Sequence, residues 1–311
     1  MTAMHKVLRS ATLVLALCLA GPAPAGQAPA ASAVEVVVEG LQGRLLRHAD
    51  LPSRHIRPRH VDVWLPPDYA RGNARHPVLY MHDGQNLFGA APTPGGTDWG
   101  VAETIARLAA TGGIRAPIVV AVWNTAERLA EYMPRAPLAG EPVEFLAGQP
   151  AMPPSHVLSD AYLAFLVDEL KPYIDREYRT LPGREATAIM GSSMGGLVSL
   201  YALARHPGVF GAAAALSTHW PAGDGIAIDW FARALPPAGG HRLYFDFGTA
   251  TLDAAYAPFQ QRMDEGVRAL GYRQGVDWLT LRFEGHAHSE AAWRARLDQP
   301  LRFLFAPATP D

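Results

Sequence analysis

The sequence ATAIMGSSMGGLVSLYALARH, residues 186–206, decides the fold. It begins with the apolar run Ala186–Met190, which has the length and composition of a strand buried on both faces. The turn Gly191-Ser192-Ser193-Met194-Gly195 follows, and apolar residues then continue at helical spacing from Met194 to His206. A buried strand, a tight glycine-flanked turn and a helix indicate one unit of an α/β sheet.

The same alternation of strand and helix continues on both sides of this unit. We expect strands at Val34–Glu39, Gly43–His48, His60–Leu65, Pro77–Met81, Pro117–Trp123, Ala186–Met190, Ala212–Leu216, Leu243–Phe247 and Trp278–Phe283. We expect helices at Trp99–Thr111, Ser159–Tyr178 with a bend at Pro172, Met194–His206, Phe259–Leu270 and Ala291–Leu297. This order predicts a mostly parallel central sheet with helices on both faces, and functional groups at the carboxyl ends of its strands.

Ser193 is the candidate nucleophile. A serine hydroxyl reacts only beside a base and a pair of donors aimed at the developing oxyanion. In α/β-hydrolases the serine lies on a sharp strand-to-helix turn with small residues two before and two after it, and the next N–H, here that of Met194, faces the reacting carbonyl. The alternative is a glycine-rich turn that only packs a strand on a helix. Ser192 takes the variable position of the motif, where its side chain points away from a substrate.

A base and an acid must follow the serine in the chain. His286 and His288 both come after the last predicted strand, on a loop at the carboxyl edge of the sheet. Asp253 lies past the end of the strand Leu243–Phe247, where it can accept the Nδ1–H of the histidine. Its alternative role is a helix cap before Ala254. Asp246, inside the strand, and Asp264, on a helix, are interpreted as structural.

Other residues near strand ends are candidates for binding. Gly84, in the loop after the strand Pro77–Met81, permits a close backbone approach and a second oxyanion donor, although the polar residues of this loop can also satisfy one another in a buried turn. A possible substrate pocket contains His82, Asp83, Trp123, Asn124, His219 and Trp220. Core packing is an equally good account of the aromatic residues.

The first 33 residues have the three-part pattern of a secretory signal peptide. His5, Lys6 and Arg9 precede the short apolar run ATLVLALCLA, and small residues follow. This run is too short to span a bilayer. Cleavage is expected near residue 25 or 33, which leaves residues 34–311 as a single domain exported to the periplasm or the extracellular space. An uncleaved anchor or a disordered leader is the alternative, and a lipoprotein is disfavoured by the bulky Leu17 before Cys18.

Composition excludes several classes of protein. Cys18 is the one cysteine and lies within the leader, so thiol catalysis, disulfides and cysteine zinc sites are excluded from the mature chain. The formal net charge of −2 becomes −4 without Lys6 and Arg9, and no basic cluster indicates a nucleic-acid partner. Two segments interrupt the pattern: residues 135–157, expected to be a cover over the active site or a disordered loop, and the insertion 222–240.

Several segments, most of residues 60–300, resemble the putative-esterase family of the α/β-hydrolases, which includes enterochelin-esterase-like, feruloyl-esterase-like and S-formylglutathione-hydrolase-like proteins. The segments are VDVWLPPDY, PVLYMHDGQNLF, PIVVAVWNTAERLAEYMPR, SDAYLAFLVDELKPYIDREYRT, MGSSMGGLVSLYALARHPGVFGAAAALSTHW, YFDFGTATLD and HSEAAWRARL. The family pattern His-Asn-Glu-x-x-Trp, with Ser289 in place of Asn, selects His288, and Gly-Thr-x-x-x-Asp selects Asp253. The resemblance also implies Gln85 as the second oxyanion donor and no metal or organic cofactor.

Together these observations predict a serine esterase with the triad Ser193, Asp253 and His288, oxyanion donors at the N–H groups of Met194 and Gln85, and a small-molecule or polymer-linked ester as substrate. An acyltransferase that passes the acyl group to a sugar or lipid alcohol is the first alternative. A binding protein that retains the fold without turnover is the second. No stable membrane span is expected after removal of the leader.

Overall fold

The computed structural model describes residues 33–89, 93–146 and 148–307. By their contacts, these described residues belong to one compact unit. The predicted leader lies outside the described residues except for Ala33, so its cleavage stays a prediction.

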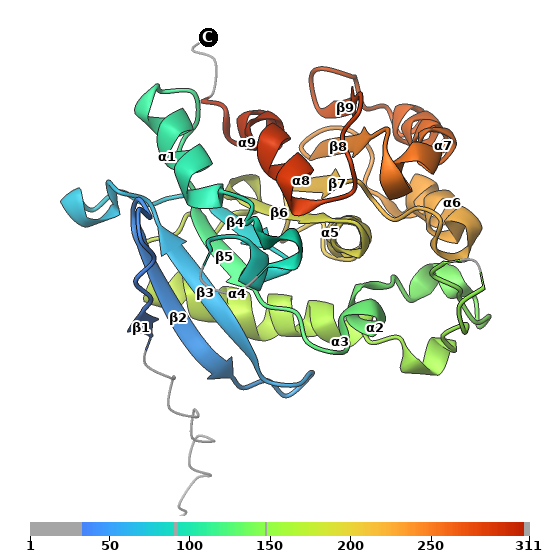
Figure 1. Cartoon of the computed structure of the whole chain (residues 1–311), viewed down its shortest axis with the longest axis horizontal. Coiled ribbons are helices and arrows are strands. Elements are labelled where there is room, and N and C mark those ends of the chain that lie inside the picture. Colours follow the sequence, from blue (N-terminus) through green and yellow to red (C-terminus); the bar gives the residue numbers. More distant parts are fainter. Residues whose placement is uncertain (1–32, 90–92, 147, 308–311) are drawn as a thin grey trace, which may run out of the picture. The chain divides into compact units, whose positions relative to one another are not determined.

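One sheet of nine strands organises the described chain, in the order β1-β2-β3-β5-β4-β6-β7-β8-β9 (Figure 1). Pairing is antiparallel from β1 through β2 and β3 to β5, and parallel from β5 onward. This is the mostly parallel α/β sheet that the sequence predicts. The strands are β1 (Val34–Glu35), β2 (Arg44–Leu51), β3 (Arg59–Leu65), β4 (Val78–Met81), β5 (Ile118–Val122), β6 (Thr187–Ser192), β7 (Ala212–Leu216), β8 (Arg242–Gly248) and β9 (Trp278–Phe283).

An α-helix follows each strand from β4 onward. The helices are α1 (Val101–Ala110), α2 (Arg128–Tyr132), α3 (Ser159–Ala164), α4 (Lys171–Glu177), α5 (Met194–Arg205), α6 (Ile226–Ala234), α7 (Ala257–Ala269), α8 (Glu290–Arg296) and α9 (Asp298–Phe305). A π-helical turn, Phe165–Leu170, joins α3 to α4 directly before Pro172. Proline lacks the N–H of a regular helix, and the wider turn accommodates it within one continuous helical segment.

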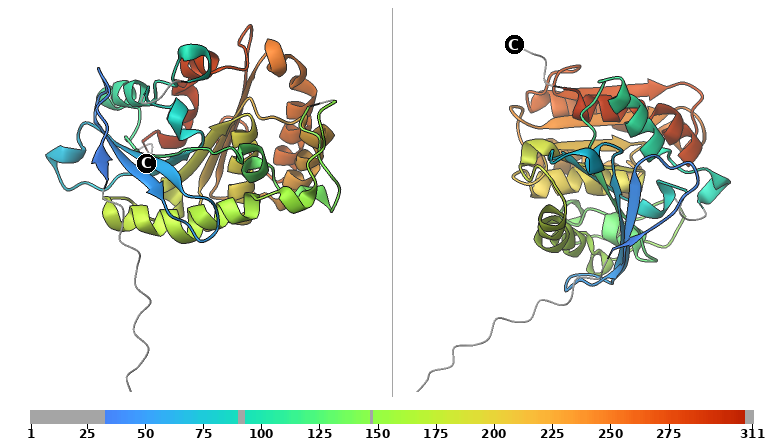
Figure 2. Two further views of the ribbon diagram at one scale, coloured as in Figure 1. Left: turned by 60° about the horizontal axis from the view of Figure 1, so that its bottom comes forward. Right: turned by 90° about the vertical axis from the view of Figure 1, so that its left-hand side faces the viewer.

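Buried strands point alternate side chains into two hydrophobic cores, one on each face of the sheet. In β4, Val78 and Tyr80 join one core while Leu79 and Met81 join the other. Residues of α2 to α7 pack in the first core, and residues of α1, α8 and α9 in the second. Figure 2 shows ribbons of helices on both sides of the sheet. The prediction of helices on both faces is therefore confirmed.

Three features of the pattern differ from the prediction. The segment 222–240 is not a plain insertion, because it contains α6, whose Ala227, Ile228 and Phe231 are buried at helical spacing. Helix α9 was not expected, and Pro300 lies in its first turn, where a proline is tolerated. The first strand, expected at Val34–Glu39, is only two residues long. Beyond it the Val36 N–H still donates to the Leu45 carbonyl, and the chain then turns at Gly40.

The parallel strands end at one edge of the sheet, and each end leads into a loop with polar residues. His82 follows β4, Ser193 follows β6, Ser217 follows β7, Asp253 lies five residues past β8 and His288 five residues past β9. Segments that are far apart in sequence therefore meet at this edge.

Candidate active site

Ser193 occupies a strained turn between β6 and α5. Its backbone has φ 57° and ψ −123°, a conformation that residues other than glycine rarely adopt. The end of β7 holds the turn, because the Ser193 N–H donates to the Leu216 carbonyl at 2.9 Å and the His219 N–H donates to the Ser193 carbonyl at 3.2 Å. The side chain of Ser193 remains partly accessible.

Glycine is required beside this turn. A Cβ on Gly191 would lie 2.8 Å from the carbonyl carbon and oxygen of Gly195, which is too close for non-bonded atoms. A Cβ on Gly195 would lie 3.4 Å from His82 Cβ and 3.6 Å from Asp83 Oδ2. The first turn of α5 therefore lies against the loop that follows β4.

Asp253 and His288 meet in a direct hydrogen bond. His288 Nδ1 lies 2.6 Å from Asp253 Oδ1, and the carboxylate is almost fully buried. Its Oδ2 accepts from the Ser217 hydroxyl at 2.5 Å and from the Gly248 N–H at 2.7 Å. Burial acts to raise the pKa of Asp253, but the hydrogen bonds from His288, Ser217 and Gly248 outweigh it and hold this pKa below its usual value. The interpretation of Asp253 as a helix cap is wrong, because its carboxylate makes these bonds instead.

Two aromatic rings fix the His288 imidazole. The Trp293 ring lies edge-on with centroids 5.1 Å apart, and the Tyr256 ring lies edge-on at 5.9 Å. The His288 N–H also donates to the Thr251 hydroxyl at 2.8 Å. His286, the other candidate, keeps a buried Nδ1 that has no hydrogen-bond partner in the described chain. The geometry thus favours His288.

His219 links the Ser193 turn to the His288 side of the site. Its N–H donates to Ser193, and its Nδ1 shares a hydrogen bond of 2.9 Å with the Tyr256 hydroxyl. Neither Ser193 Oγ nor His288 Nε2 forms a hydrogen bond with any group of residues 33–89, 93–146 and 148–307. Catalytic hydrogen bonds are often long before a substrate binds. Both atoms are therefore free to engage a ligand.

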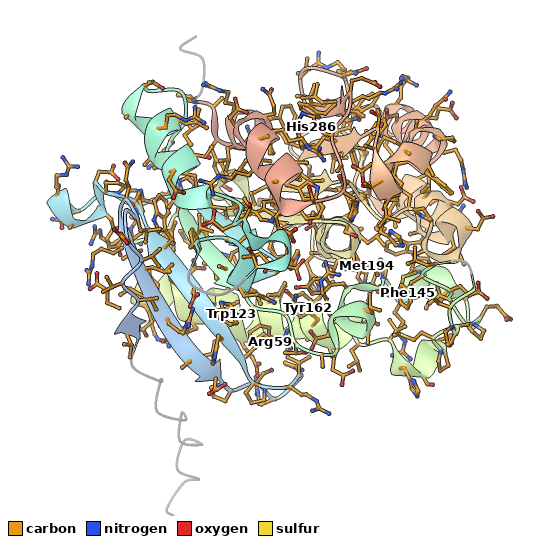
Figure 3. All side chains as sticks on the ribbon, in the orientation of Figure 1. Arg59, Trp123, Phe145, Tyr162, Met194 and His286 are labelled. Atoms are coloured by element: carbon orange, nitrogen blue, oxygen red, sulfur yellow. The ribbon has the colours of Figure 1, made fainter. Side chains whose placement is uncertain are left out.

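The N–H groups of Met194 and Gln85 come from adjoining segments. Met194 begins α5, and its place among all side chains is labelled in Figure 3. A Cβ on Gly84 would lie 2.6 Å from the carbonyl of Ala121, so only glycine lets the loop approach β5 this closely. Gln85 Oε1 accepts from the Asn124 N–H at 3.1 Å. No side chain or loop carbonyl of the described chain accepts from the N–H of Met194 or of Gln85.

Asp83 anchors the same loop through an ion pair in which its own carboxylate is buried and Arg128 is partly exposed. Its carboxylate accepts from Arg128 Nε at 2.7 Å, from Arg128 Nη2 at 2.8 Å and from Asn124 Nδ2 at 2.6 Å. Burial raises the pKa of Asp83, but Arg128 and Asn124 more than offset this and lower it. Asp83 therefore has its hydrogen bonds with Asn124 and Arg128. This agrees with the alternative that the polar groups of the loop satisfy one another.

The remaining predicted pocket residues are mostly engaged in packing. His82 is buried, its Nδ1 lies 2.8 Å from the Tyr162 hydroxyl, and burial lowers its pKa to about 3. Trp220 is buried and donates from Nε1 to Gln260 at 2.9 Å. Trp123 donates from Nε1 to Asp62 at 2.9 Å, toward the antiparallel strands. These contacts support the packing interpretation for His82 and Trp220, and the place of all three residues in a substrate pocket stays a prediction.

The segment 135–157 is attached beside the site. Its Phe145 carbonyl lies 2.8 Å from His219 Nε2, and its Glu144 carbonyl accepts from the Gly223 N–H at 2.8 Å. Val143 and Phe145 are buried in the core. The segment is thus joined to the loop after β7, two residues from Ser217, and we keep its role as a cover as a hypothesis.

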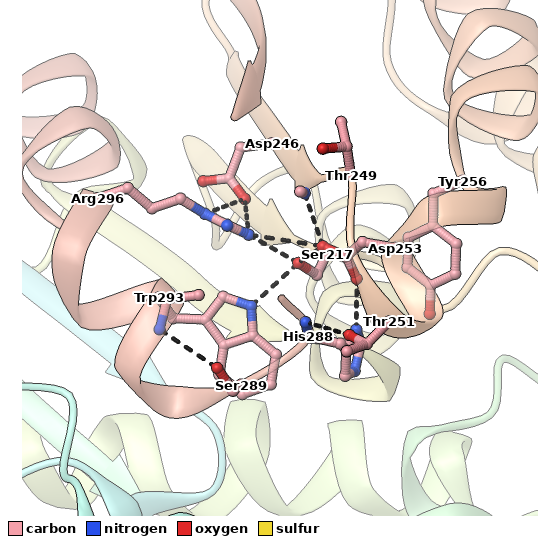
Figure 4. A network of polar contacts seen from close by, with 12 residues as sticks. Ser217, Asp246, Thr249, Thr251, Asp253, Tyr256, His288, Ser289, Trp293 and Arg296 are labelled. Atoms are coloured by element: carbon pink, nitrogen blue, oxygen red, sulfur yellow. Dashed lines mark hydrogen bonds and ion pairs between the residues drawn. The ribbon is translucent and has the colours of Figure 1, made fainter. Parts of the chain in front are cut away.

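A buried network lies behind Asp253, and sequence analysis missed its role (Figure 4). It comprises Ser217, Asp246, Trp293 and Arg296, all of which are nearly or fully buried. Asp246 was expected to be structural, and it does pair with Arg296 at 3.0 Å. Ser217 carried one available signal, since it is a small polar residue directly after the apolar run Ala212–Leu216.

No group of three or more His, Cys, Asp or Glu side chains in the described ranges is arranged to hold a metal ion. None of the described helices combines the length and the apolar character that crossing a bilayer requires.

Residues 53–304 match the model of the family described as "Putative esterase". Over 167 residues the chain is 25% identical to the uncharacterized protein YbbA of Bacillus subtilis (strain 168), a match that covers 52% of this chain and only 58% of that relative. The chain therefore spans less than two thirds of the length of the curated relative.

Solved structures share the fold at low sequence identity. An IroE-like serine hydrolase from Shewanella oneidensis has a TM-score of 0.62 at 21% identity, with 81% of this chain and 78% of that chain covered. A ferulic acid esterase from Anaeromyces mucronatus, solved in complex with ferulic acid, has a TM-score of 0.59 at 20% identity, with 86% and 92% covered. The enterobactin esterase of Shigella flexneri has 0.57 at 19% identity, with 89% and 60% covered. These likenesses show the α/β-hydrolase fold.

Proposed function

The chain belongs to the putative-esterase family, and on that basis we propose that it hydrolyses a carboxylic ester through an acyl-enzyme on Ser193. The observation that carries the proposal is the 2.6 Å hydrogen bond between His288 Nδ1 and Asp253 Oδ1. An imidazole whose Nδ1–H is given to a carboxylate presents Nε2 as a proton acceptor.

In the proposed reaction Ser193 Oγ attacks the ester carbonyl carbon, and its proton passes to His288 Nε2. The tetrahedral intermediate then collapses, the alcohol leaves with the proton from His288, and the acyl group remains on Ser193. Water attacks this acyl-enzyme, gives a proton to His288 and releases the carboxylic acid. Asp253 keeps its negative charge throughout and stabilises the imidazolium.

The oxyanion of the intermediate requires donors that no other group uses. The N–H groups of Met194 and Gln85 meet this condition, and Gly84 brings the second of them close to the strand β5. The Asp83–Arg128 pair fixes the loop from which Gln85 projects. These contacts support the assignment of both N–H groups as oxyanion donors.

The decisive experiment compares three proteins on p-nitrophenyl acetate: wild type, Ser193→Ala and Ser192→Ala. Ser192 is the adjacent buried serine and serves as the matched control. We expect Ser193→Ala to lose activity by about 10⁴-fold or more, while Ser192→Ala keeps most of it. A fluorophosphonate probe should label wild type and Ser192→Ala but not Ser193→Ala. Equal turnover in wild type and Ser193→Ala would disprove the proposal.

A panel of esters tests which acyl group and which alcohol the protein accepts. The relatives named above include a ferulic acid esterase and an enterobactin esterase, so the panel contains methyl ferulate beside acetyl, butyryl and acetyl-sugar esters. Analysis of the products with added alcohols separates hydrolysis from acyl transfer, because a transferase gives a new ester instead of free acid.

We also propose that the chain is exported. The support is the leader pattern of residues 1–33. Amino-terminal sequencing of the protein from the periplasm or medium should begin shortly after residue 25 or residue 33; a chain that still begins at Met1 would contradict export by cleavage.

A further inference from the structure

The Ser217 hydroxyl has every hydrogen-bonding position occupied. Trp293 Nε1 donates to its oxygen at 3.0 Å, and Arg296 Nη2 donates to it at 2.7 Å. The third contact, 2.5 Å long, runs to Asp253 Oδ2 (Figure 4). Ser217 is fully buried, so no solvent molecule competes for these positions.

The direction of the third bond follows from the chemistry of the first two. An indole N–H and a guanidinium can only donate, so together they fill both acceptor positions of the hydroxyl oxygen. The one hydroxyl proton of Ser217 must then point to Asp253, which has to accept it. A carboxylic acid proton on Oδ2 would have no position to occupy, since the Gly248 N–H also points at this oxygen.

The hydrogen bonds at Asp253 Oδ2 determine which donor Asp253 Oδ1 can accept from. Because Oδ2 is committed to Ser217 and Gly248, Oδ1 is left for the Nδ1–H of His288. The imidazole thereby takes the tautomer in which Nε2 is unprotonated and can accept the proton in the proposed reaction. A wrong tautomer at this point removes the base altogether.

Helix α8 supplies the groups that hold Ser217. Trp293 and Arg296 are three residues apart, so their side chains leave the helix on one face, five and eight residues after His288. Arg296 is held in turn by Asp246, at 3.0 Å from Nη2, and its guanidinium lies over the Phe283 ring at 5.2 Å. Arg296 Nη2 is also 3.9 Å from Asp253 Oδ2.

The charges of this network balance when the histidine is protonated. Asp246 and Asp253 are negative and Arg296 is positive, so a protonated His288 brings the sum to zero. Other titratable groups close to His288 are Glu290, His219 and Tyr256, none of which is hydrogen-bonded to Ser217 in the described chain.

We propose that Ser217 is a positioning residue that, held by Trp293 and Arg296, directs its proton to Asp253 and so fixes the reactive tautomer of His288. This inference rests on the proposed esterase function for its kinetic consequences, but not for its structural ones.

The test compares Ser217→Ala with Ser199→Ala. Ser199 is an equally buried serine whose hydroxyl donates to the Gly195 carbonyl at 2.7 Å and does not touch Asp253. With p-nitrophenyl acetate we expect Ser217→Ala to lower kcat by about tenfold to a hundredfold at nearly constant KM. Since a carboxylate with one donor fewer holds the imidazolium proton more tightly, the acidic limb of kcat/KM should move to higher pH by about half a unit or more. Ser199→Ala should show neither effect.

A second readout does not depend on turnover. The proton shared by His288 Nδ1 and Asp253 gives a far-downfield ¹H NMR resonance, which we expect in wild type, in Ser193→Ala and in Ser199→Ala, and expect shifted or broadened in Ser217→Ala. If wild type shows the resonance but hydrolyses no ester, the proposed function fails while this inference is still tested by the resonance of Ser217→Ala.

Trp293→Phe provides a variant that keeps the aromatic ring beside His288 and removes only one donor to Ser217. It should shift the resonance in the same direction as Ser217→Ala, by a smaller amount. If circular dichroism shows that Ser217→Ala does not fold, the resonance of Trp293→Phe tests the proposal in its place. An unchanged resonance and an unchanged acidic limb in the folded variants would overturn the proposal.

Discussion

Arg128 holds both carboxylate oxygens of Asp83, through Nε at 2.7 Å and Nη2 at 2.8 Å, and Asp83 lies two residues before Gln85. A bidentate pair of this kind fixes the angle of the loop as well as its charge. The position of one proposed oxyanion donor therefore depends on a residue from another segment of the chain.

Replacement of Arg128 by methionine should disturb this loop. Asp83 would stay buried without its cation, so we expect a fall of about 3 kcal/mol in the free energy of unfolding and a loss of about tenfold to a hundredfold in kcat/KM. Denaturant titration and ester hydrolysis measure the two quantities. Arg262→Met is the control, because the Arg262–Asp229 pair is exposed at 44% and 65% and should contribute little. Equal behaviour of the two variants would contradict this role of Arg128.

Asp253→Asn should retain the fold and lose the reaction. An amide can present its N–H to His288 and so stabilise the unreactive tautomer, and we expect kcat to fall by about 10³- to 10⁴-fold with KM little changed. Asp264→Asn is the matched change, since Asp264 bonds to Gln260 and Thr280 and lies away from His288. Steady-state kinetics of both variants decide the point, and a similar kcat for the two would remove Asp253 from the mechanism.

Gly191→Ala should prevent closure of the turn at Ser193. The added methyl group would meet the Gly195 backbone at 2.8 Å, and backbone on both sides cannot move aside. We expect a soluble yield and a melting temperature well below those of wild type, and no measurable hydrolysis. Gly208→Ala, where a Cβ meets nothing within 4 Å, should resemble wild type in both measurements. A fully active Gly191→Ala protein would show that the turn tolerates a side chain.

His82 should make the protein less stable in acid. Burial lowers its pKa to about 3 in the folded chain, from about 6.5 in the unfolded chain. The unfolded chain therefore binds the proton more tightly below pH 6.5, and stability falls as the pH decreases toward 3, by about 1.4 kcal/mol for each unit. The lowered pKa of Asp253 acts in the same direction, below about pH 4.

The measurement is the free energy of unfolding of wild type, His82→Phe and His55→Phe at pH 7 and pH 4.5. His82→Phe should flatten the difference between the two pH values, whereas His55, which is exposed, should leave the difference as in wild type. An unaltered pH dependence in His82→Phe would mean that this imidazole does not carry the effect.

The parallel part of the sheet could be predicted because its strands are short apolar runs between turn residues. Ala212–Leu216 and Trp278–Phe283 were predicted with the bounds that the structure has. Helix α6 was hidden by its flanks, since glycines precede it and Leu235-Pro236-Pro237 ends it, and this composition resembles a loop. Elements with a clear apolar period are therefore visible in the sequence, and short helices between breakers are not.

The candidate site shows the same division. Strand ends and chain order were enough to select Ser193, Asp253 and the histidine pair, because loops after parallel strands meet at one edge. The contact of Arg296 with Ser217, 79 residues away, could not be predicted. It depends on the direction in which buried side chains leave α8 and β7, and neither direction is encoded in local spacing.

Because the backbone of Ser193 is strained, the expected activity depends on the fraction of molecules that is folded. A conformation at φ 57° and ψ −123° costs about 1–3 kcal/mol and persists only while its bonds to Leu216 and His219 are intact. A partly opened chain would relax the turn and displace the proposed nucleophile at the same moment. Ester turnover should therefore act as a reporter of intact native molecules, with the same denaturation midpoint as far-ultraviolet circular dichroism, so that every unit of measured activity counts folded protein.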